Sequence, residues 1–363
     1  LAGAKLTRSD PPATRDADLV VALNAAGAVC VGALNMGEFA YDFTGENAHY
    51  GPCRNPHDTS RMTGGSSSGS GAAVGAGFVP LTLGSDTNGS LRVPASLCGV
   101  FSLKPTYGRL SRGGSYPFVD SLDHLGPLAR TAADLAIAYD AMQGPSTRDH
   151  AQARRPAEPV MDRLDLGDVR VGVLGGWFEA QQSPDAKDRG ARVSAAFADT
   201  RVLTLDGVEA GRAAAYLITN AESSAWHLPR LRQDAAGFDP ETRDRFLAGA
   251  LLPTAWLHKA QRVRRWWLDR LMAAFESVDL LVCPATPFSA PSIGQKTIEL
   301  AGREVLLRPN LGLLAQPFSC VGLPVVTVPV FNPGEAPIGV QLIAPPWRED
   351  LAIAAARHLE DAG

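Results

Sequence analysis

The chain has 363 residues, of which 45% are hydrophobic and 20% are charged, and its formal net charge is −4 at pH 7. This length can bury one large core, and the sequence contains neither internal repeats nor a low-complexity linker. We therefore expect a single domain spanning residues 1–363. The slightly acidic balance argues against a nucleic-acid partner, because that kind of binding depends on neutralising phosphates with a basic face.

The cysteines are odd in number and widely spaced, and no CxxC pair or Cys/His cluster at zinc spacing occurs. They are Cys30, Cys53, Cys98, Cys283 and Cys320. We expect reduced thiols in a cytoplasmic protein, with no metal and no other cofactor. The longest weakly polar stretch, residues 71–84, contains Pro80 and is too short to cross a membrane.

Hydrophobic periodicity and turn residues predict the elements of the first half of the chain. They are a helix over residues 16–26, a short buried strand over 28–31, a turn-rich segment over 42–71, a small-residue helix over 71–77, a brief strand over 80–84 and an amphipathic helix over 131–142. The strand at 80–84 leads directly into residues 85–90, a run of turn-forming residues.

The second half begins with a predicted strand over residues 170–174. Asp239 as N-cap and Pro240 at the first helical position predict a helix start, and the helical pattern continues to Ser277 with a break or kink at Pro253. Three further apolar runs have the length of strands: residues 280–283, 324–330 and 338–343. Strands that alternate with helices indicate an α/β sheet covered on both faces.

The most unusual stretch is residues 64–71, which reads Gly-Gly-Ser-Ser-Ser-Gly-Ser-Gly. Such a composition is common in flexible linkers, but this run lies between structured segments. Residues 65–69 also fit G-x-S-x-G, the nucleophile elbow of α/β hydrolases, although no strand precedes them and no downstream histidine has a distinctive setting. A dinucleotide-binding loop would need Gly or Ala where Val74 stands, and a P-loop would need a Gly-Lys-Ser/Thr end.

A longer match connects this run with a second Gly/Ser turn that ends at Ser90, 24 positions beyond Ser66. Residues 64–106 resemble the amidase signature sequence in order and without a gap. The matching segments are Gly64-Gly65-Ser66-Ser67, Gly84-Ser85-Asp86-Thr87-Asn88-Gly89-Ser90, Cys98-Gly99 and Leu103-Lys104-Pro105-Thr106, with flanking agreement at residues 35–40, 322–324 and 337–341. The resemblance implies the α/β amidase-signature fold, with a large mixed, mostly parallel β-sheet covered by helices on both faces.

The resemblance also implies a Ser–Ser–Lys triad that hydrolyses amides. Ser90 matches the nucleophile, and Ser66 matches a serine that is held by a cis peptide bond and relays a proton between the nucleophile and the lysine. A serine hydroxyl needs a base within hydrogen-bond reach before it becomes a good nucleophile. The backbone N–H groups of Thr87, Asn88 and Gly89, together with that of Ser90, would stabilise the oxyanion.

Two charged residues flank this turn, and two residues depart from the family pattern. Asp86 and Arg92 are predicted to form a structural ion pair that holds the turn in shape, because arginine suits bidentate binding of a carboxylate. Ser68 and Asn88 stand where the family usually has glycine. Both residue types tolerate loop geometry, so we expect no loss of function from either.

The triad lysine is not assigned to a residue of the sequence. In the family it lies on a strand that we expect upstream of Leu1. Lys5 stands just after the place where that strand and its loop should have passed, and Lys104 matches a different family position. We therefore assign neither of them as the base.

Within the family, several segments resemble the enzymes that hydrolyse a carboxylated biuret. These segments are residues 38–41, 46–52, 55–58, 249–253, 308–314 and 344–351. The resemblance implies hydrolysis of a terminal urea-type amide through a carbamoyl-serine intermediate, with release of ammonia. Such a substrate is an anion and needs a cation, for which Arg308 is the candidate, and Tyr41 is a second candidate contact. The alternative interpretations are an exposed loop arginine and a packing tyrosine.

Two other functions stay open. One is the glutaminase (A) subunit of a tRNA-dependent amidotransferase, although its acidic contact to glutamine would fall near Gly312, which has no charge. The other is an amidase-like scaffold without catalysis. Apart from a small-molecule amide substrate, the resemblance implies a heterotetramer formed with a small helical partner subunit, with no direct nucleic-acid or membrane contact.

Overall fold

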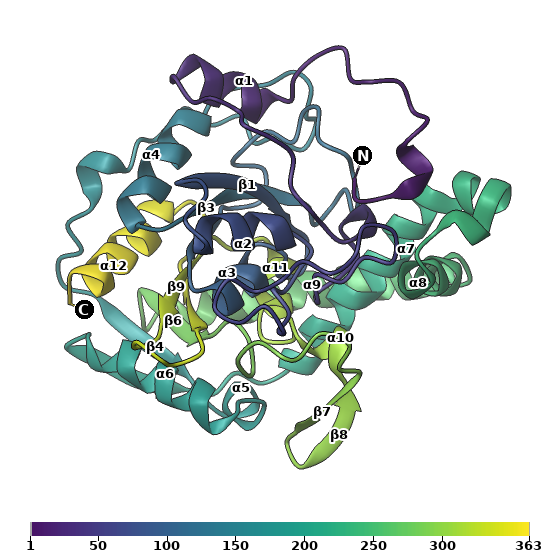
Figure 1. The fold of residues 1–363 in the computed structure, drawn as a ribbon. Coiled ribbons are helices and arrows are strands. Elements are labelled where there is room, and N and C mark those ends of the chain that lie inside the picture. The colour runs from purple at the N-terminus through teal and green to yellow at the C-terminus, as the bar shows by residue number, and fades with distance from the viewer. Residues whose placement is uncertain (1, 363) are drawn as a thin grey trace.

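The computed structural model describes residues 2–362 and is built around an eight-stranded sheet with the strand order β1-β3-β2-β9-β10-β6-β4-β5 (Figure 1). The strands are β1 (Leu81–Asp86), β2 (Phe101–Lys104), β3 (His124–Ala129), β4 (Arg170–Leu174), β5 (Asp199–Leu203), β6 (Leu280–Pro284), β9 (Val325–Val330) and β10 (Ile338–Ile343). A separate ribbon of β7 (Thr297–Leu300) and β8 (Arg303–Leu306) projects from the body of the molecule (Figure 1).

The helices surround this sheet. They are α1 (Asp18–Ala25), α2 (Ser68–Gly75), α3 (Arg92–Cys98), α4 (Ala132–Met142), α5 (Trp177–Ala180), α6 (Pro184–Ala195), α7 (Val208–Asp234), α8 (Pro240–Ala250), α9 (Thr254–Ala274), α10 (Leu307–Asn310), α11 (Gln316–Val321) and α12 (Glu349–Ala362). Short 3-10 turns lie at Lys5–Thr7, Glu38–Ala40, Met161–Arg163 and Ala235–Gly237.

The sheet is mixed, as predicted, but the expectation that it is mostly parallel is wrong. Five of its seven neighbouring strand pairs are antiparallel, and only the β4–β5 and β4–β6 pairs are parallel. The apolar runs that predicted these strands indicate that both faces of the strands are buried, and β6 and β10 are indeed buried along their whole length. Burial on both faces is usual for parallel strands, but it does not fix strand direction.

The buried strand predicted over residues 28–31 is not formed. Residues 28–37 belong to no helix or strand, and the side chains of Val29 and Val31 are 81% and 78% exposed. A strand needs a hydrogen-bonded neighbour as well as apolar residues. Within residues 2–362 this segment has no such neighbour, so its composition alone was a misleading signal.

Local signals located several of the helices well, although others, including the long α7, were not predicted. The predicted helix over 131–142 is α4, whose N-cap Thr131 accepts a hydrogen bond from the Asp134 N–H. The Asp239 carboxylate caps α8 by accepting from the Glu241 N–H at 3.0 Å, with Pro240 in the first turn. Pro253 separates α8 from α9, as expected for a residue that cannot donate its nitrogen to a helix interior.

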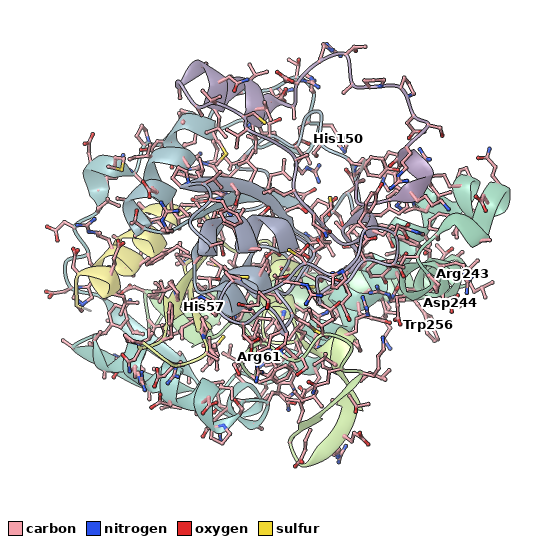
Figure 2. The ribbon with its side chains drawn as sticks, in the orientation of Figure 1. His57, Arg61, His150, Arg243, Asp244 and Trp256 are labelled. Atoms are coloured by element: carbon pink, nitrogen blue, oxygen red, sulfur yellow. The ribbon has the colours of Figure 1, made fainter. Side chains whose placement is uncertain are left out.

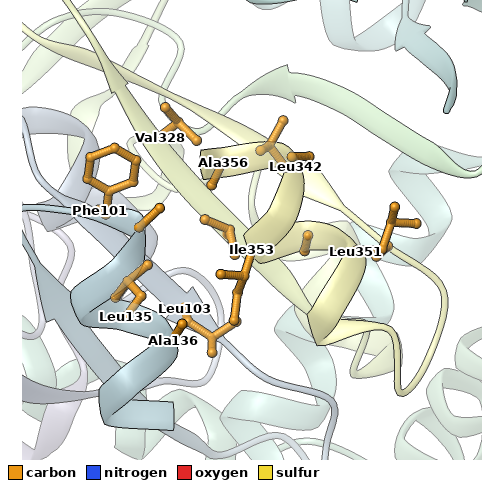
Figure 3. Packing of buried hydrophobic residues seen from close by; sticks show 14 of the residues in the cluster. Phe101, Leu103, Leu135, Ala136, Val328, Leu342, Leu351, Ile353 and Ala356 are labelled. Atoms are coloured by element: carbon orange, nitrogen blue, oxygen red, sulfur yellow. The ribbon is translucent and has the colours of Figure 1, made fainter. Parts of the chain in front are cut away.

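The core lies in two layers, one on each face of the sheet. On one face, α4 and α12 pack against alternate residues of β2, β9 and β10, including Leu103, Val328 and Leu342 (Figure 3). On the other face, α3 and α9 pack against the strand residues whose side chains point the other way, such as Val325 of β9 and Ile343 of β10. This period-2 division follows from the alternation of side chains along a strand.

Close packing of α2 against α3 places the Gly/Ser run beside the nucleophile turn. A Cβ at Gly71 would lie 3.0 Å from Cβ of Pro94, so a larger residue would push the two helices apart. This contact explains the small residues predicted for α2. As a result, the segment before α2 and the turn before α3 lie at the same end of the molecule.

Across residues 2–362, no helix is both long enough and apolar enough to cross a membrane.

Candidate active site

A pocket of about 480 Å³ opens over the turn that contains Ser90. Its walls come from five parts of the chain: residues 40–46, residues 87–90, Phe118, the facing sides of α7 and α8, and the segment from 295 to 316. Ser90 is 4% exposed and lies between the end of β1 and the start of α3. The predicted nucleophile therefore has access to a space that can hold a small molecule.

The run that contains Ser66 is hydrogen-bonded to this turn. The Ser67 N–H donates to the Ser90 carbonyl oxygen at 3.3 Å, and the Gly37 N–H donates to the Ser66 carbonyl oxygen at 3.0 Å. The Gly65–Ser66 peptide bond is cis, as the family resemblance implied. Ser66 Oγ is fully buried and has no hydrogen-bond partner among the described residues. Because buried hydroxyls are nearly always paired, this atom is a candidate for proton transfer.

The predicted ion pair of Asp86 and Arg92 is confirmed and entirely buried. Arg92 Nε lies 2.9 Å from Asp86 Oδ2, and Arg92 Nη2 lies 3.0 Å from Oδ1. Arg92 also donates to Gln341 Oε1 at 2.7 Å and to the Ala315 carbonyl at 2.9 Å. Burial by itself would raise the pKa of Asp86, but the Arg92 guanidinium outweighs it and holds that pKa well below its usual range.

The Asp86 carboxylate also shapes the turn directly, by accepting the Gly89 N–H at 2.7 Å. The predicted oxyanion contribution of Gly89 therefore conflicts with the structure, because this donor is already used. The backbone N–H groups of Thr87, Asn88 and Ser90 have no hydrogen-bond acceptor within residues 2–362. These three donors stay available at the turn.

Two side chains anchor the turn to its surroundings. The Thr87 hydroxyl donates to Asp123 Oδ1 at 2.6 Å, and Asn88 Nδ2 donates to Thr219 Oγ1 at 2.8 Å on α7. Asn88 Oδ1 is buried and has no partner in the part of the chain that the structure describes. A glycine at position 88, which the family usually has, would lack the link to α7.

Arg308 lies in the pocket wall, but the interpretation that it is free for an anionic substrate conflicts with its contacts. It forms an ion pair with Asp42, its Nη2 lies 3.5 Å from Glu46 Oε2, and its Nε lies 3.4 Å from Glu241 Oε2. Three carboxylates from the protein already balance this charge. Arg308 thus joins residues 42–46 to α8 and closes one side of the pocket.

Arg245, which the sequence reasoning missed, is the better candidate cation. It lines the pocket and has no carboxylate within ion-pair distance among the described residues. Its Nε donates to the Glu241 carbonyl at 2.8 Å, and its guanidinium carbon lies 3.8 Å from the centroid of the Tyr41 ring. Burial lowers the pKa of Arg245, which nevertheless stays charged because guanidinium is so strongly basic.

A helical pattern could have indicated Arg245. Glu241, Asp244 and Arg245 are spaced i, i+3 and i+4 on α8, and all three line the pocket. Residues with this spacing share one face of a helix. Arg243 on the same helix instead pairs with the neighbouring Asp244 at 2.8 Å (Figure 2 labels both).

Tyr41 lines the pocket, in agreement with both interpretations of its role. Its hydroxyl donates to Asn220 Oδ1 on α7, and its ring packs against Phe118 and Phe246. Burial raises the pKa of Tyr41 above its usual value, so the phenol stays protonated. Its ring and hydroxyl are both engaged within the protein, which favours packing and support of Arg245 over direct substrate contact.

Neither lysine considered in the sequence lines the pocket. Burial lowers the pKa of Lys104 to about 7, and its amine donates to the carbonyl oxygens of Leu323 and Pro105. Lys5 is exposed and lies in the first 3-10 turn. Among residues 2–362, no group of three or more His, Cys, Asp or Glu side chains is arranged to hold a metal ion.

Comparisons with known proteins show which family has this sequence and this fold. The Amidase family profile matches residues 2–353. The chain is 54% identical over 369 positions to AtzE, a 1-carboxybiuret hydrolase subunit of Pseudomonas sp. (strain ADP), covering 100% of this chain and 80% of that protein. It is 36% identical to a glutamyl-tRNA(Gln) amidotransferase subunit of Symbiobacterium thermophilum, covering 92% of this chain and 74% of the relative.

A solved structure has almost the same backbone, with a TM-score of 0.98 at 53% identity over 100% of this chain and 80% of the other. It is described as a vestigial protein complex that reveals the evolutionary origins of an s-triazine catabolic enzyme. The chain belongs to the amidase family. The family and the fold class predicted from the signature motif are thereby confirmed.

Proposed function

We propose that the protein hydrolyses a terminal amide through an acyl-serine intermediate on Ser90. The observation that carries this proposal is the backbone hydrogen bond that joins the two serine-bearing segments at the pocket. Ser90 lies at the pocket, and Ser66, whose buried hydroxyl lacks a partner among the described residues, belongs to a run that is hydrogen-bonded to the Ser90 backbone. The family membership of the chain gives the same reaction class.

In the first half-reaction, Ser90 Oγ attacks the carbonyl carbon, and its proton passes to the Ser66 hydroxyl and on to the triad lysine that the family resemblance implies, which is not assigned to a described residue. The N–H groups of Thr87, Asn88 and Ser90 stabilise the oxyanion. The C–N bond then breaks, the nitrogen takes a proton back along the same relay, and ammonia leaves. Water attacks the acyl-Ser90 carbon, its proton enters the relay, and the acid is released as the serine hydroxyl re-forms.

The substrate that we propose is a carboxylated biuret or similar urea-type amide, so that the acyl group on Ser90 is a carbamoyl group. The 54% identity to a 1-carboxybiuret hydrolase subunit supports this choice, as does the unneutralised charge of Arg245 in the pocket. Glutamine is the second candidate because of the 36% identical amidotransferase subunit. The position expected to provide a carboxylate for its ammonium is Gly312, which has no side chain, and the Phe43 ring fills the space there, where a Cβ would come within 2.6 Å.

Initial rates of ammonia release from 1-carboxybiuret, biuret, malonamide and glutamine test the proposal. We expect the highest kcat/KM for 1-carboxybiuret, a lower one for the neutral amides and the lowest for glutamine. Preference for glutamine would support the amidotransferase alternative. Absence of ammonia release from all four would favour the non-catalytic scaffold.

We also propose that the protein works as a heterotetramer, in a complex with a small helical partner subunit. The relative with 54% identity is named as one subunit of an enzyme, and the solved structure with 53% identity is described as a complex. Native mass spectrometry of the protein co-produced with the products of neighbouring reading frames measures this. A single species with two copies of each chain is expected, and a lone protomer or homodimer would contradict the proposal.

Replacement of Arg245 tests the choice of substrate cation. In Arg245→Gln we expect KM for 1-carboxybiuret to rise about 10- to 100-fold, since a hydrogen bond to a charged group contributes about 1.5–3 kcal/mol. KM for malonamide should change little. The matched control is Arg265→Gln on α9, which pairs with Asp269 outside the pocket lining and should keep the wild-type KM. An equal rise for the anionic and the neutral substrate would remove Arg245 from the carboxylate site.

A further inference from the structure

Behind the nucleophile turn, the Asp123 carboxylate joins two walls of the pocket. Its Oδ1 accepts from the Thr87 hydroxyl at 2.6 Å, and its Oδ2 accepts from the N–H groups of Phe118 and Val119 at 2.8 and 2.9 Å. Thr87 and Phe118 line the pocket, but Asp123 itself does not. A single side chain thus links an expected oxyanion donor to the pocket segment that contains Phe118.

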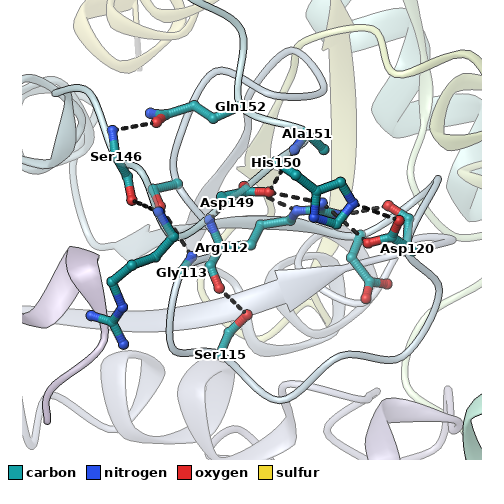
Figure 4. A network of polar contacts seen from close by, with 12 residues as sticks. Arg112, Gly113, Ser115, Asp120, Ser146, Asp149, His150, Ala151 and Gln152 are labelled. Carbon is teal, nitrogen blue, oxygen red and sulfur yellow. Dashed lines mark hydrogen bonds and ion pairs between the residues drawn. The ribbon is translucent and has the colours of Figure 1, made fainter.

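The surroundings of Asp123 contain few charges that could replace it. Arg112, in the loop before β3, is the cation that acts on this carboxylate, but it is hydrogen-bonded to Asp149 and Asp120 (Figure 4). From the other elements, Glu222 on α7 accepts from Ser121, and Arg264 on α9 donates to the Ser121 carbonyl. The adjacent His124 directs Nδ1 to the Asp86 carbonyl at 3.0 Å, and burial lowers its pKa well below the usual value.

We propose that Asp123 is a positioning residue for the amide-hydrolysis reaction. Its carboxylate holds Thr87 in place to stabilise the oxyanion, and protonation of this carboxylate slows the chemical step. This inference rests on the proposed function, because the turn that it positions is the one that carries Ser90. As a carboxylate, Asp123 is an acceptor for all three donors. When it is protonated, Oδ2 still accepts from the two N–H groups and the O–H donates to Thr87 Oγ1, so the hydrogen bond reverses and a charge-assisted bond becomes a weaker neutral one that orients the turn less firmly.

The acid–base properties of the group agree with this geometry. Burial is the largest influence and raises the pKa of Asp123 to about 6, although the Thr87 hydroxyl and the two N–H groups oppose it. The carboxylate form therefore predominates above pH 6 and the neutral form below it. On this account kcat falls as the pH falls through about 6, and it falls for every substrate.

Asparagine is a close mimic of the protonated state, because its amide oxygen can accept from Phe118 and Val119 while its NH₂ group donates to Thr87. We therefore expect Asp123→Asn to have a kcat at pH 8 that is roughly tenfold lower, which is less than the 10²–10³-fold cost of removing an oxyanion donor outright. The inflection near pH 6 should disappear, and KM should stay within about twofold because the substrate contacts are kept.

The test measures kcat and KM for ammonia release from pH 5 to pH 8.5, and in parallel the rate at which a fluorophosphonate probe labels Ser90. Asp120→Asn, three residues away and outside the pocket lining, is the matched control and should keep the inflection. Should Asp123→Asn fold poorly, Thr87→Val removes the same hydrogen bond from the other side, and Thr87→Ser should restore the wild-type profile.

A wild-type profile in Asp123→Asn, with the inflection retained, would overturn the positioning role while leaving the amidase proposal intact. A pH-dependent labelling rate that is lost in Asp123→Asn supports the inference even where none of the amides is hydrolysed, and then only the substrate assignment fails. If Ser90 in the wild type is neither labelled nor active, the proposed function and this inference both fail.

Discussion

Ser90→Ala is expected to lose ammonia release by about 10⁶-fold in kcat, the scale at which removal of a catalytic serine disables a serine hydrolase. The hydroxyl is the only atom that forms the acyl bond in the proposed reaction, and no neighbouring side chain can replace it at the same position. Folding should be unaffected, because Ser90 Oγ makes no hydrogen bond within residues 2–362 that the substitution would break. Initial rates with 1-carboxybiuret and a thermal melt measure the two effects.

Ser194→Ala is the matched control for this variant. Ser194 lies near the end of α6, outside the pocket lining, and its hydroxyl donates only to the Ala191 carbonyl. We expect both its activity and its melting temperature to match those of the wild type. Turnover by Ser90→Ala at more than a few per cent of the wild-type rate would contradict the assignment of the nucleophile.

The largest effect on stability is expected from Arg92→Leu, at about 3–5 kcal/mol of unfolding free energy. Loss of one partner of a buried pair leaves the other charge without compensation, which costs more than the pair itself contributes. Asp86 would then lie fully buried with its carboxylate unpaired, and Gln341 would lose a 2.7 Å donor. Chemical denaturation at pH 7 measures the change, and activity should fall with it because the Gly89 turn depends on Asp86.

Arg192→Leu serves as the control for a surface pair. Arg192 Nη1 lies 3.0 Å from Glu335 Oε2, and the two side chains are 36% and 30% exposed. Such exposed pairs contribute little to stability, because water and salt screen the two charges. If Arg92→Leu cost no more than Arg192→Leu, the buried pair would not be the support of the turn that we describe.

The pH dependence of the Asp86 contribution has a definite sign. The folded protein holds the pKa of Asp86 well below its ordinary value of 3.8, so the unfolded chain binds this proton more tightly than the folded one. Its contribution to stability is therefore complete above about pH 4 and is lost as the pH falls further. In Arg92→Leu this acid-labile part of the stability should be absent.

The elements that could be predicted from the sequence were those marked by local signals, such as a helix cap, a proline or an apolar run. The apolar pattern of residues 131–142, the N-cap Asp239, the proline at 253 and the apolar runs of β6, β9 and β10 located their elements closely. Strand direction was not predictable in this way, because β9 and β10 are buried on both faces whether their neighbours run parallel or antiparallel. Residues 28–31 failed for a related reason, since their apolar character says nothing about a pairing partner.

The candidate site likewise has some residues that could be predicted from the sequence and others that could not. Ser66, Ser90 and the Asp86–Arg92 pair were predictable because they belong to one continuous motif in the sequence. The roles of Arg308 and Arg245 were not predictable. An arginine can bind an anionic substrate only if no carboxylate of the protein already pairs with it, and such carboxylates can lie far away in the sequence. Arg308 meets Asp42 across such a separation, whereas Arg245 has no carboxylate within ion-pair distance among the described residues. Residue type alone could not distinguish the two arginines.

The most direct test of the account is mass spectrometry of the protein stopped with acid during turnover of 1-carboxybiuret. We expect a carbamoyl-type adduct on the peptide that contains Ser90, formed at the rate of the ammonia burst and absent from Ser90→Ala. An adduct on another residue, or steady ammonia release with no Ser90 adduct under conditions where hydrolysis of the acyl group is slowed, would contradict it.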